Sequence, residues 1–203
     1  LSPELRAAAA RHATLLHTLD ADGGGSFTDC LQRAAAEDIE GGARGEDPAA
    51  LLYTSGTTGR SKGAVISRAN LAAGSRALVE AWEFRCADVL LHVLPLFHVH
   101  GLFMALNTVL AAGASLLMMN KFDARGALTL MPQASVFMGV PTHYTRLLAL
   151  AEFGPAAAAS MRLFVSGSAP LLAETHREFE RRCGHRILER YGMTETQVIA
   201  SNP

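Results

Sequence analysis

The stretch "SVFMGVPTHYTRLLALAEFGPAAAASMRLFVSG", from Ser135 to Gly167, decides the fold. It begins and ends with short apolar runs, each the length of one strand. The segment between them, from Thr142 to Glu152, has the spacing of apolar residues typical of an amphipathic helix. Strands that are buried on both faces read as continuous apolar runs, and a helical crossover joins strands that lie parallel. This stretch therefore predicts a strand, a helix and a second, parallel strand.

The same alternation continues on both sides of this unit. We predict four further strands, "AALLYT" (49–54), "GAVIS" (63–67), "VLLHVLP" (89–95) and "ASLLMM" (114–119). The other predicted helices are Asn70 to Trp82, Gly101 to Ala112 and Leu171 to Cys183. Residues 49–203 are thus expected to form an α/β core with mostly parallel sheets flanked by helices.

Residues 1–48 have a different character. The alanine-rich run from Pro3 to His12 predicts a helix, "ATLLHTL" (13–19) a short strand, and Phe27 to Ala36 a second helix. The charged, glycine-rich segment from Glu37 to Pro48 predicts a mobile linker. We interpret this part as an incomplete N-terminal subdomain segment followed by a linker.

Composition excludes several classes of function. The 203 residues are 49% hydrophobic and carry a formal net charge of -1, which favours a globular protein without a nucleic-acid footprint. The three cysteines are far apart and form no Cys-x-x-Cys pair, so a reducing, cytoplasmic location is expected. The apolar window from Leu102 to Met119 is interrupted by polar residues and glycine, and we interpret it as core, with no membrane partner.

Polar, glycine-containing segments follow three of the predicted strands: Thr54 to Gly63, Pro95 to Gly101 and Ser166 to Pro170. Ligands collect at the carboxyl ends of strands in parallel sheets. We therefore expect these three loops to share one cleft.

The first loop, "TSGTTGRSKG", has the chemistry of a phosphate-binding loop. Its glycines allow backbone amides to point at an anion, its hydroxyl groups add donors, and Lys62 adds a positive charge. It is not a Walker A loop, because Lys62 precedes Gly63 instead of a serine or threonine. The alternative is an ordinary hairpin turn, since Ser, Thr and Gly are common turn residues.

Four segments together resemble the adenylate-forming enzymes, which include the acyl-CoA synthetases. They are "YTSGTTGRSKG" (53–63), "PLFHVHG" (95–101), "VSGSAPL" (165–171) and "ERYGMTET" (189–196). Within that superfamily, "FMGVPTHYTRLL" and "GHRILERYGMTET" are similar to the malonyl-CoA synthetases. The resemblance covers most of residues 50–203. It implies ATP, Mg²⁺ and coenzyme A as cofactor and co-substrates, and malonate or methylmalonate as the acid.

The resemblance also implies roles for individual residues. The β- and γ-phosphates would be held by Thr54, Ser55, Gly56, Thr57, Thr58, Gly59 and Lys62. Thr194 would contact the α-phosphate and Glu195 would bind Mg²⁺. Nucleotide contacts are implied for Gly167, Ser168, Ala169, Tyr191, Gly192 and Thr194, with Tyr191 offering a face to adenine. Lys62, Thr194, Glu195 and His98 are the predicted catalytic residues.

Arg190 bears on the identity of the acid. A guanidinium immediately before Tyr191 could bind the second carboxylate of a dicarboxylic acid, and would disfavour a hydrocarbon tail. The alternative is a structural ion pair with Glu189, Glu178 or Glu180. Arg146 is a second candidate for substrate binding.

His98 is expected to line the acyl pocket, where it could orient the reacting carboxylate or control the approach of the thiol. It could equally be an ordinary core histidine. His98 and His100 lack cysteine or carboxylate neighbours at metal-ligand spacing, so we do not expect a zinc site.

The family's ribose-binding and hinge motifs, and its lysine-bearing C-terminal domain, are absent from these 203 residues. We therefore interpret the chain as a fragment that synthesises no appreciable acyl-CoA alone. Two other functions remain open: a synthetase for short-chain, medium-chain or aryl acids, and a non-catalytic nucleotide-binding module. The oligomeric state is not predicted.

Overall fold

The computed structural model describes residues 2–13, 15–20, 22–34, 41–54 and 61–202. The chain divides into two compact units, Leu1–Gly42 and Ala43–Pro203. The smaller unit contains helices α1 (Pro3–Arg11) and α2 (Ser26–Arg33). The predicted strand over residues 13–19 is wrong in its described part, because residues 15–19 pair with no other strand. That segment is a loop in which Thr18 exchanges backbone and hydroxyl hydrogen bonds with Ser26.

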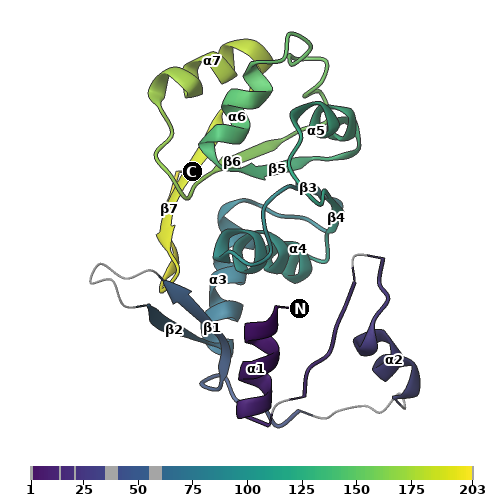
Figure 1. Cartoon of the computed structure of the whole chain (residues 1–203). Helices are drawn as coiled ribbons and strands as arrows, with labels where there is room; N and C mark the ends of the chain where they lie inside the picture. The colour runs from purple at the N-terminus through teal and green to yellow at the C-terminus, as the bar shows by residue number, and fades with distance from the viewer. Residues whose placement is uncertain (1, 14, 21, 35–40, 55–60, 203) are drawn as a thin grey trace. The chain divides into compact units, whose positions relative to one another are not determined.

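The larger unit is built on a six-stranded sheet (Figure 1). In spatial order, its strands are β4 (Ser115–Met118), β3 (Val89–His92), β5 (Val136–Gly139), β6 (Leu163–Ser166), β7 (Ile187–Met193) and β8 (Gln197–Ser201). Neighbouring strands from β4 to β7 are parallel, and β8 is antiparallel to β7. The mostly parallel α/β fold expected from the sequence is confirmed.

Helices cover both faces of this sheet (Figure 1). One layer contains α5 (Ala124–Leu130), the short 3₁₀ turn η2 (Met131–Gln133), α6 (Pro141–Leu148) and α7 (Ala173–Cys183). The other contains α3 (Arg68–Ala81), the π-helix η1 (His100–Leu106) and α4 (Asn107–Ala112). Successive strand residues alternate between the layers: Phe137 packs in the first, whereas Val136 and Met138 pack in the second. This double burial explains why the strands read as continuous apolar runs.

Strands β1 (Pro48–Thr54) and β2 (Lys62–Ser67) form a separate antiparallel hairpin. The prediction that these two segments are buried on both faces is wrong. Ile66 packs into the core, but Tyr53 is 72% exposed and Leu51 and Val65 are also exposed on the hairpin. Ser67 then begins α3 through a capping box with Asn70, which fixes where the strand ends and the helix begins.

The segment predicted as one helix from Gly101 to Ala112 starts as a π-helix and continues as α4. A side chain at Gly101 would lie 2.3 Å from the Pro95 carbonyl oxygen, so glycine lets the helix start pack directly on the preceding loop. Met104 and Ala105 are buried, which agrees with reading this window as core. Within the described residues, no helix is long and apolar enough to cross a membrane.

Three elements were not predicted from the sequence. Helix α5 lies between β4 and β5, and β7 and β8 form an antiparallel pair over residues 187–201. The pair has an irregular register between Tyr191 and Gly192, and its tight turn carries Thr194 and Glu195.

At the opposite end of the sheet from the carboxyl ends of its parallel strands, the buried Asp88 and the partly exposed Arg162 form a structural cluster. Arg162 donates to both carboxylate oxygens of Asp88 and to the carbonyl oxygens of Trp82 and Glu83. The Ser135 hydroxyl donates to the same carboxylate, at 2.7 Å. Burial alone would raise the pKa of Asp88, but these hydrogen bonds and the Arg85 amide outweigh it and lower the pKa to about 2.

We expect Asp88→Ala to lower the free energy of unfolding by about 2–3 kcal/mol at pH 7, because the Arg162 guanidinium loses its partner. A depressed pKa stabilises the folded state above the ordinary pKa of aspartate, and this contribution is lost as the pH falls toward 2. The difference between wild type and variant should therefore shrink below about pH 4. Urea unfolding, followed by the fluorescence of Trp82, the chain's single tryptophan, measures the free energy of unfolding of both proteins at each pH.

Glu178→Ala is the matched control, since Glu178 pairs with Arg181 on the exposed side of α7. It should leave the free energy of unfolding almost unchanged, because solvent screens an exposed ion pair. A loss from Asp88→Ala that is equally small, or that stays constant from pH 7 to pH 2, would contradict the role given to this cluster.

Candidate functional site

Described residues from the three predicted polar segments lie at one pocket. Thr54 at the end of β1, His98 after β3 and Ser168 after β6 line one pocket of about 240 Å³. In the sheet, β4 lies on one side of β3 and β5 lies on the other. The loops that leave the carboxyl ends of neighbouring strands therefore run in opposite directions, and this leaves room for a ligand at the end of β3.

Arg190 lies at the centre of this region, on β7. It lines the first pocket and also a neighbouring one of about 280 Å³ that includes Ala169, Tyr191 and Gly192. The residue is only 4% exposed, and burial lowers the pKa of its guanidinium to about 10. The side chain therefore presents a fully charged group between two pockets at neutral pH.

No carboxylate of the described residues pairs with Arg190. Its one described hydrogen bond runs from Nη2 to the Ser168 hydroxyl at 3.2 Å, and its Nε is buried without a partner. The structural ion pair considered from the sequence is wrong: Glu178 pairs with Arg181 and Glu180 with Arg186. Glu189 instead accepts a hydrogen bond from the Leu171 amide.

The glycine-rich loop is described only at its two ends. Thr54 and Lys62 face each other in the last paired position of the β1–β2 hairpin, and Lys62 is exposed. Ser55, Gly56, Thr57, Thr58 and Gly59 lie outside the described residues. Their predicted contacts with phosphate remain predictions.

Thr194 and Glu195 reach the same pocket from the β7–β8 turn. Tyr191 points to the neighbouring pocket and is largely exposed, which leaves its ring available for stacking. Gly167 and Ser168 follow β6, and Gly167 packs directly against the Arg190 guanidinium. The structure thus brings most of the described motif residues together at two adjoining pockets, but Lys62 and Gly167 line neither of them.

His98 is held in a defined tautomer. Its Nδ1 accepts a hydrogen bond from the His100 amide at 3.1 Å, so the neutral ring carries its proton on Nε2. Burial, and secondarily the positive charge of Arg190, lower the pKa of His98 below its usual value. His98 is therefore a neutral N–H donor at the pocket instead of a second cation.

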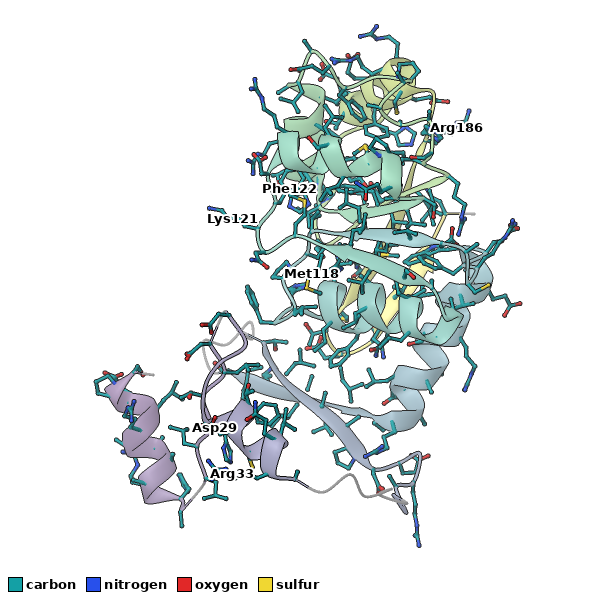
Figure 2. All side chains as sticks on the ribbon, turned by 90° about the vertical axis from the view of Figure 1, so that its right-hand side faces the viewer. Asp29, Arg33, Met118, Lys121, Phe122 and Arg186 are labelled. Atoms are coloured by element: carbon teal, nitrogen blue, oxygen red, sulfur yellow. The ribbon has the colours of Figure 1, made fainter. Side chains whose placement is uncertain are left out.

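Arg146 does not line either pocket. It lies on α6 with its guanidinium carbon 4.9 Å from the centre of the Phe122 ring, and His143 stacks on the same ring. Figure 2 shows Lys121 extending away from the unit, whereas the neighbouring Phe122 lies inward. Burial, then Arg146, lowers the pKa of His143 to about 4. In this structure Arg146 is engaged in aromatic packing.

Sequence reasoning missed three apolar residues that line the first pocket: Val99, Met104 and Met193. Met104 lies on the π-helix, a form that widens one turn and is often found at functional sites. The sequence does not distinguish an apolar residue that lines a pocket from one that is buried in the core. Only the position of the loop after β3 could have suggested Val99.

The described residues contain no group of three or more His, Cys, Asp or Glu side chains that could hold a metal ion by themselves. The single carboxylate of Glu195 beside Thr194 fits Mg²⁺, which needs one or two carboxylates when phosphates and water complete its shell. The donors present suit a nucleotide-bound Mg²⁺ and do not suit zinc.

Comparisons with known proteins agree with this arrangement. The sequence model of the family "AMP-binding enzyme" matches residues 2–203. The malonate–CoA ligase of Arabidopsis thaliana is 40% identical over 178 residues, which cover 78% of this chain and 29% of that protein. The chain therefore spans less than a third of this curated relative.

Two solved structures are similar over nearly the whole chain. The ATP-bound MatB of Rhodopseudomonas palustris is 51% identical with a TM-score of 0.95, covering 98% of this chain and 40% of its own. A malonyl-CoA ligase complex with methylmalonyl-CoA and AMP is 38% identical with a TM-score of 0.81, covering 99% of this chain and 47% of its own. With the family model matching almost every residue, the chain belongs to the family of AMP-binding enzymes.

Proposed function

We propose that the whole protein is an ATP-dependent acid–thiol ligase that converts malonate and coenzyme A to malonyl-CoA, AMP and pyrophosphate. The observation that carries this proposal is Arg190: a buried guanidinium without a carboxylate partner in the described chain, facing the pocket. Burying a charge of this kind costs free energy unless an opposite charge, here from a ligand, pairs with it. Malonate keeps one carboxylate after the other is activated, and that carboxylate would pair with the Arg190 guanidinium.

The first step joins a carboxylate oxygen of malonate to the α-phosphorus of ATP and breaks its bond to pyrophosphate. The attacking and attacked groups are both anionic, so the site must supply positive charge and fixed donors. Arg190 would hold the distal carboxylate, and the Nε2–H of His98 would donate to the reacting one. Thr194 would donate to the α-phosphate. In the second step, the coenzyme A thiol attacks the acyl carbon and AMP leaves.

The remaining proposed contacts bind the nucleotide and its Mg²⁺. Thr54, Lys62 and the glycine-rich loop between them would hold the β- and γ-phosphates. Tyr191, Gly192 and Ala169 would enclose the adenine side. Glu195 would hold Mg²⁺, which when bound neutralises part of the phosphate charge. Support comes from relatives whose structures contain ATP, or methylmalonyl-CoA and AMP.

The test is acid-dependent exchange of pyrophosphate into ATP by the whole protein. Malonate and methylmalonate should support exchange at least about 100-fold better than acetate, butyrate or benzoate, because only the dicarboxylates offer a partner to the buried guanidinium. Equal exchange with butyrate would favour the alternative, a short- or medium-chain synthetase, and preference for benzoate an aryl-acid synthetase. Nucleotide binding without exchange for any acid would favour a non-catalytic module.

We propose a cytoplasmic location as well. It is supported by the three cysteines, which are all free: Cys30 and Cys86 are exposed and Cys183 is buried. Exposed free thiols are typical of a reducing compartment. The proposed partners are the small molecules malonate, ATP and coenzyme A.

A further inference from the structure

Behind the pocket, a second histidine contacts the residue that holds Arg190. The Nδ1 atom of His100 lies 3.1 Å from the Ser168 hydroxyl, and that hydroxyl lies 3.2 Å from Nη2 of Arg190. We propose that His100, acting through Ser168, positions the Arg190 guanidinium for the distal carboxylate of the acid. This inference rests on the proposed function and adds a positioning residue that does not touch the substrate.

The directions of the hydrogen bonds follow from the donors available. A guanidinium can only donate, so the Ser168 oxygen accepts from Arg190. The hydroxyl proton of Ser168 is then free to donate to Nδ1 of His100, provided that this ring carries its own proton on Nε2. The opposite tautomer would leave the serine proton without an acceptor among the described atoms. A chain of hydrogen bonds in which Arg190 donates to Ser168 and Ser168 donates to His100 therefore gives partners to more polar atoms than the opposite tautomer does.

The surroundings of His100 keep it in the neutral, accepting form. The residue is 1% exposed, and burial lowers the pKa of its ring well below the usual value. The positive charge of Arg190 acts in the same direction, as do the nearby rings of His98, His92 and His143. A protonated His100 could no longer accept from Ser168, and would repel the guanidinium beyond it.

The backbone at Gly167 packs directly against the guanidinium. A Cβ placed on Gly167 would lie 2.3 Å from Nε of Arg190, so the guanidinium packs where no other residue type leaves room. Ser168 has a φ of 68°, an unusual conformation for a residue with a side chain. Strained backbone of this kind is typical of binding and catalytic positions. Gly167 thus sets the depth of the guanidinium, while Ser168 and His100 set its rotation.

His100→Leu and Ser168→Ala in the whole protein test this arrangement by steady-state kinetics. Each should raise KM for malonate about tenfold, because the Arg190 guanidinium is no longer held in one orientation, and His100→Leu should leave KM for ATP unchanged. His100→Asn, whose amide oxygen can take the place of Nδ1, should restore KM to within about threefold of wild type. His92→Leu is the matched control, since His92 is a buried neighbouring histidine on β3 with no hydrogen bond to Ser168 or Arg190 among the described residues.

Three outcomes would overturn the proposal. His100→Leu could leave KM for malonate unchanged, it could change the KM values of malonate and ATP equally, or His92→Leu could raise KM for malonate as much. In none of these cases would His100 position Arg190 through Ser168.

A second measurement does not depend on the substrate. In protein with ¹⁵N-labelled arginine and histidine, the Nε signal of Arg190, identified by its loss in Arg190→Lys, should shift in His100→Leu and Ser168→Ala but not in His92→Leu. The His100 ring should show an unprotonated Nδ1. If wild type fails to use malonate, the proposed function fails, but these shifts still decide the positioning role. A protonated Nδ1, or an Arg190 signal unaffected by His100→Leu, would refute it.

Discussion

Arg190→Ala is expected to lower kcat/KM for malonate by about 100- to 1,000-fold, which corresponds to the cost of leaving one charge of a buried pair without its partner. Among the described residues, the Arg190 guanidinium is the only positive charge between the two pockets. In the alanine variant, the distal carboxylate would therefore enter a pocket that offers it no positive charge. Pyrophosphate exchange over a range of malonate concentrations measures this loss. Most of it should come from KM if the contact is equally strong in the ground state and the transition state.

The same variant should treat monocarboxylates differently. Butyrate offers nothing to the guanidinium, so its kcat/KM should stay the same or rise once the buried charge is gone. Arg190→Lys should lie between wild type and alanine, because an ammonium keeps the charge but loses the planar, two-pronged geometry. Arg186→Ala is the matched control: Arg186 lies at the surface (Figure 2). It is exposed and pairs with Glu180. An equal loss for malonate and butyrate in Arg190→Ala would contradict selection by Arg190.

The sequence was most informative where strands are buried on both faces. Val136, Phe137 and Met138 alternate between two helical layers, so every residue is apolar and the run is easy to recognise. The hairpin of β1 and β2 contains equally apolar residues, yet Tyr53 and Val65 are exposed. Strand pairing and burial depend on which elements pack against a segment, and this information is not local in the sequence.

The same reason explains why β7 and β8 were missed. The segment "YGMTETQV" contains glycine, threonine and glutamate, which carry little strand signal. Its structure depends on distant partners: Trp82 donates to the Ser201 hydroxyl at 3.0 Å, and Gln197 donates to the Asn70 carbonyl oxygen. The π-helical start of the Gly101 segment likewise depends on how closely it packs on Pro95.

The candidate site shows a similar division. Motif resemblance identified Arg190, His98 and Thr194, which the structure places at one pocket. It could not show whether Arg190 is paired with a glutamate, because that depends on where Glu178 and Glu180 point. It also gave Arg146 a substrate role, whereas the side chain packs on Phe122, a residue 24 positions earlier. Side-chain partners are set by tertiary structure, and a motif names only the candidates.

Gly192→Ala is expected to reduce kcat/KM by at least about 100-fold for every acid, including malonate and butyrate, because a shift of about 1 Å in a catalytic group can have this effect. An added Cβ would lie 1.8 Å from the Gln197 carbonyl oxygen and 3.0 Å from the Val198 Cα. Both are backbone atoms that cannot rotate away, so β7 and β8 must separate where they pair. The turn that carries Thr194 and Glu195 would move with them.

Gly154→Ala is the control, since its added Cβ would meet only the Arg182 carbonyl oxygen at an ordinary 3.7 Å. Trp82 fluorescence gives a second readout, because its indole N–H donates to Ser201 on β8 and reports whether that strand is displaced. Wild-type exchange rates in Gly192→Ala would contradict the steric argument. A loss for all acids in Gly192→Ala, beside a loss confined to dicarboxylates in Arg190→Ala, would separate the two roles of β7. In the proposed function, the strand would place the groups that act on the nucleotide, and the Arg190 side chain would select the acid.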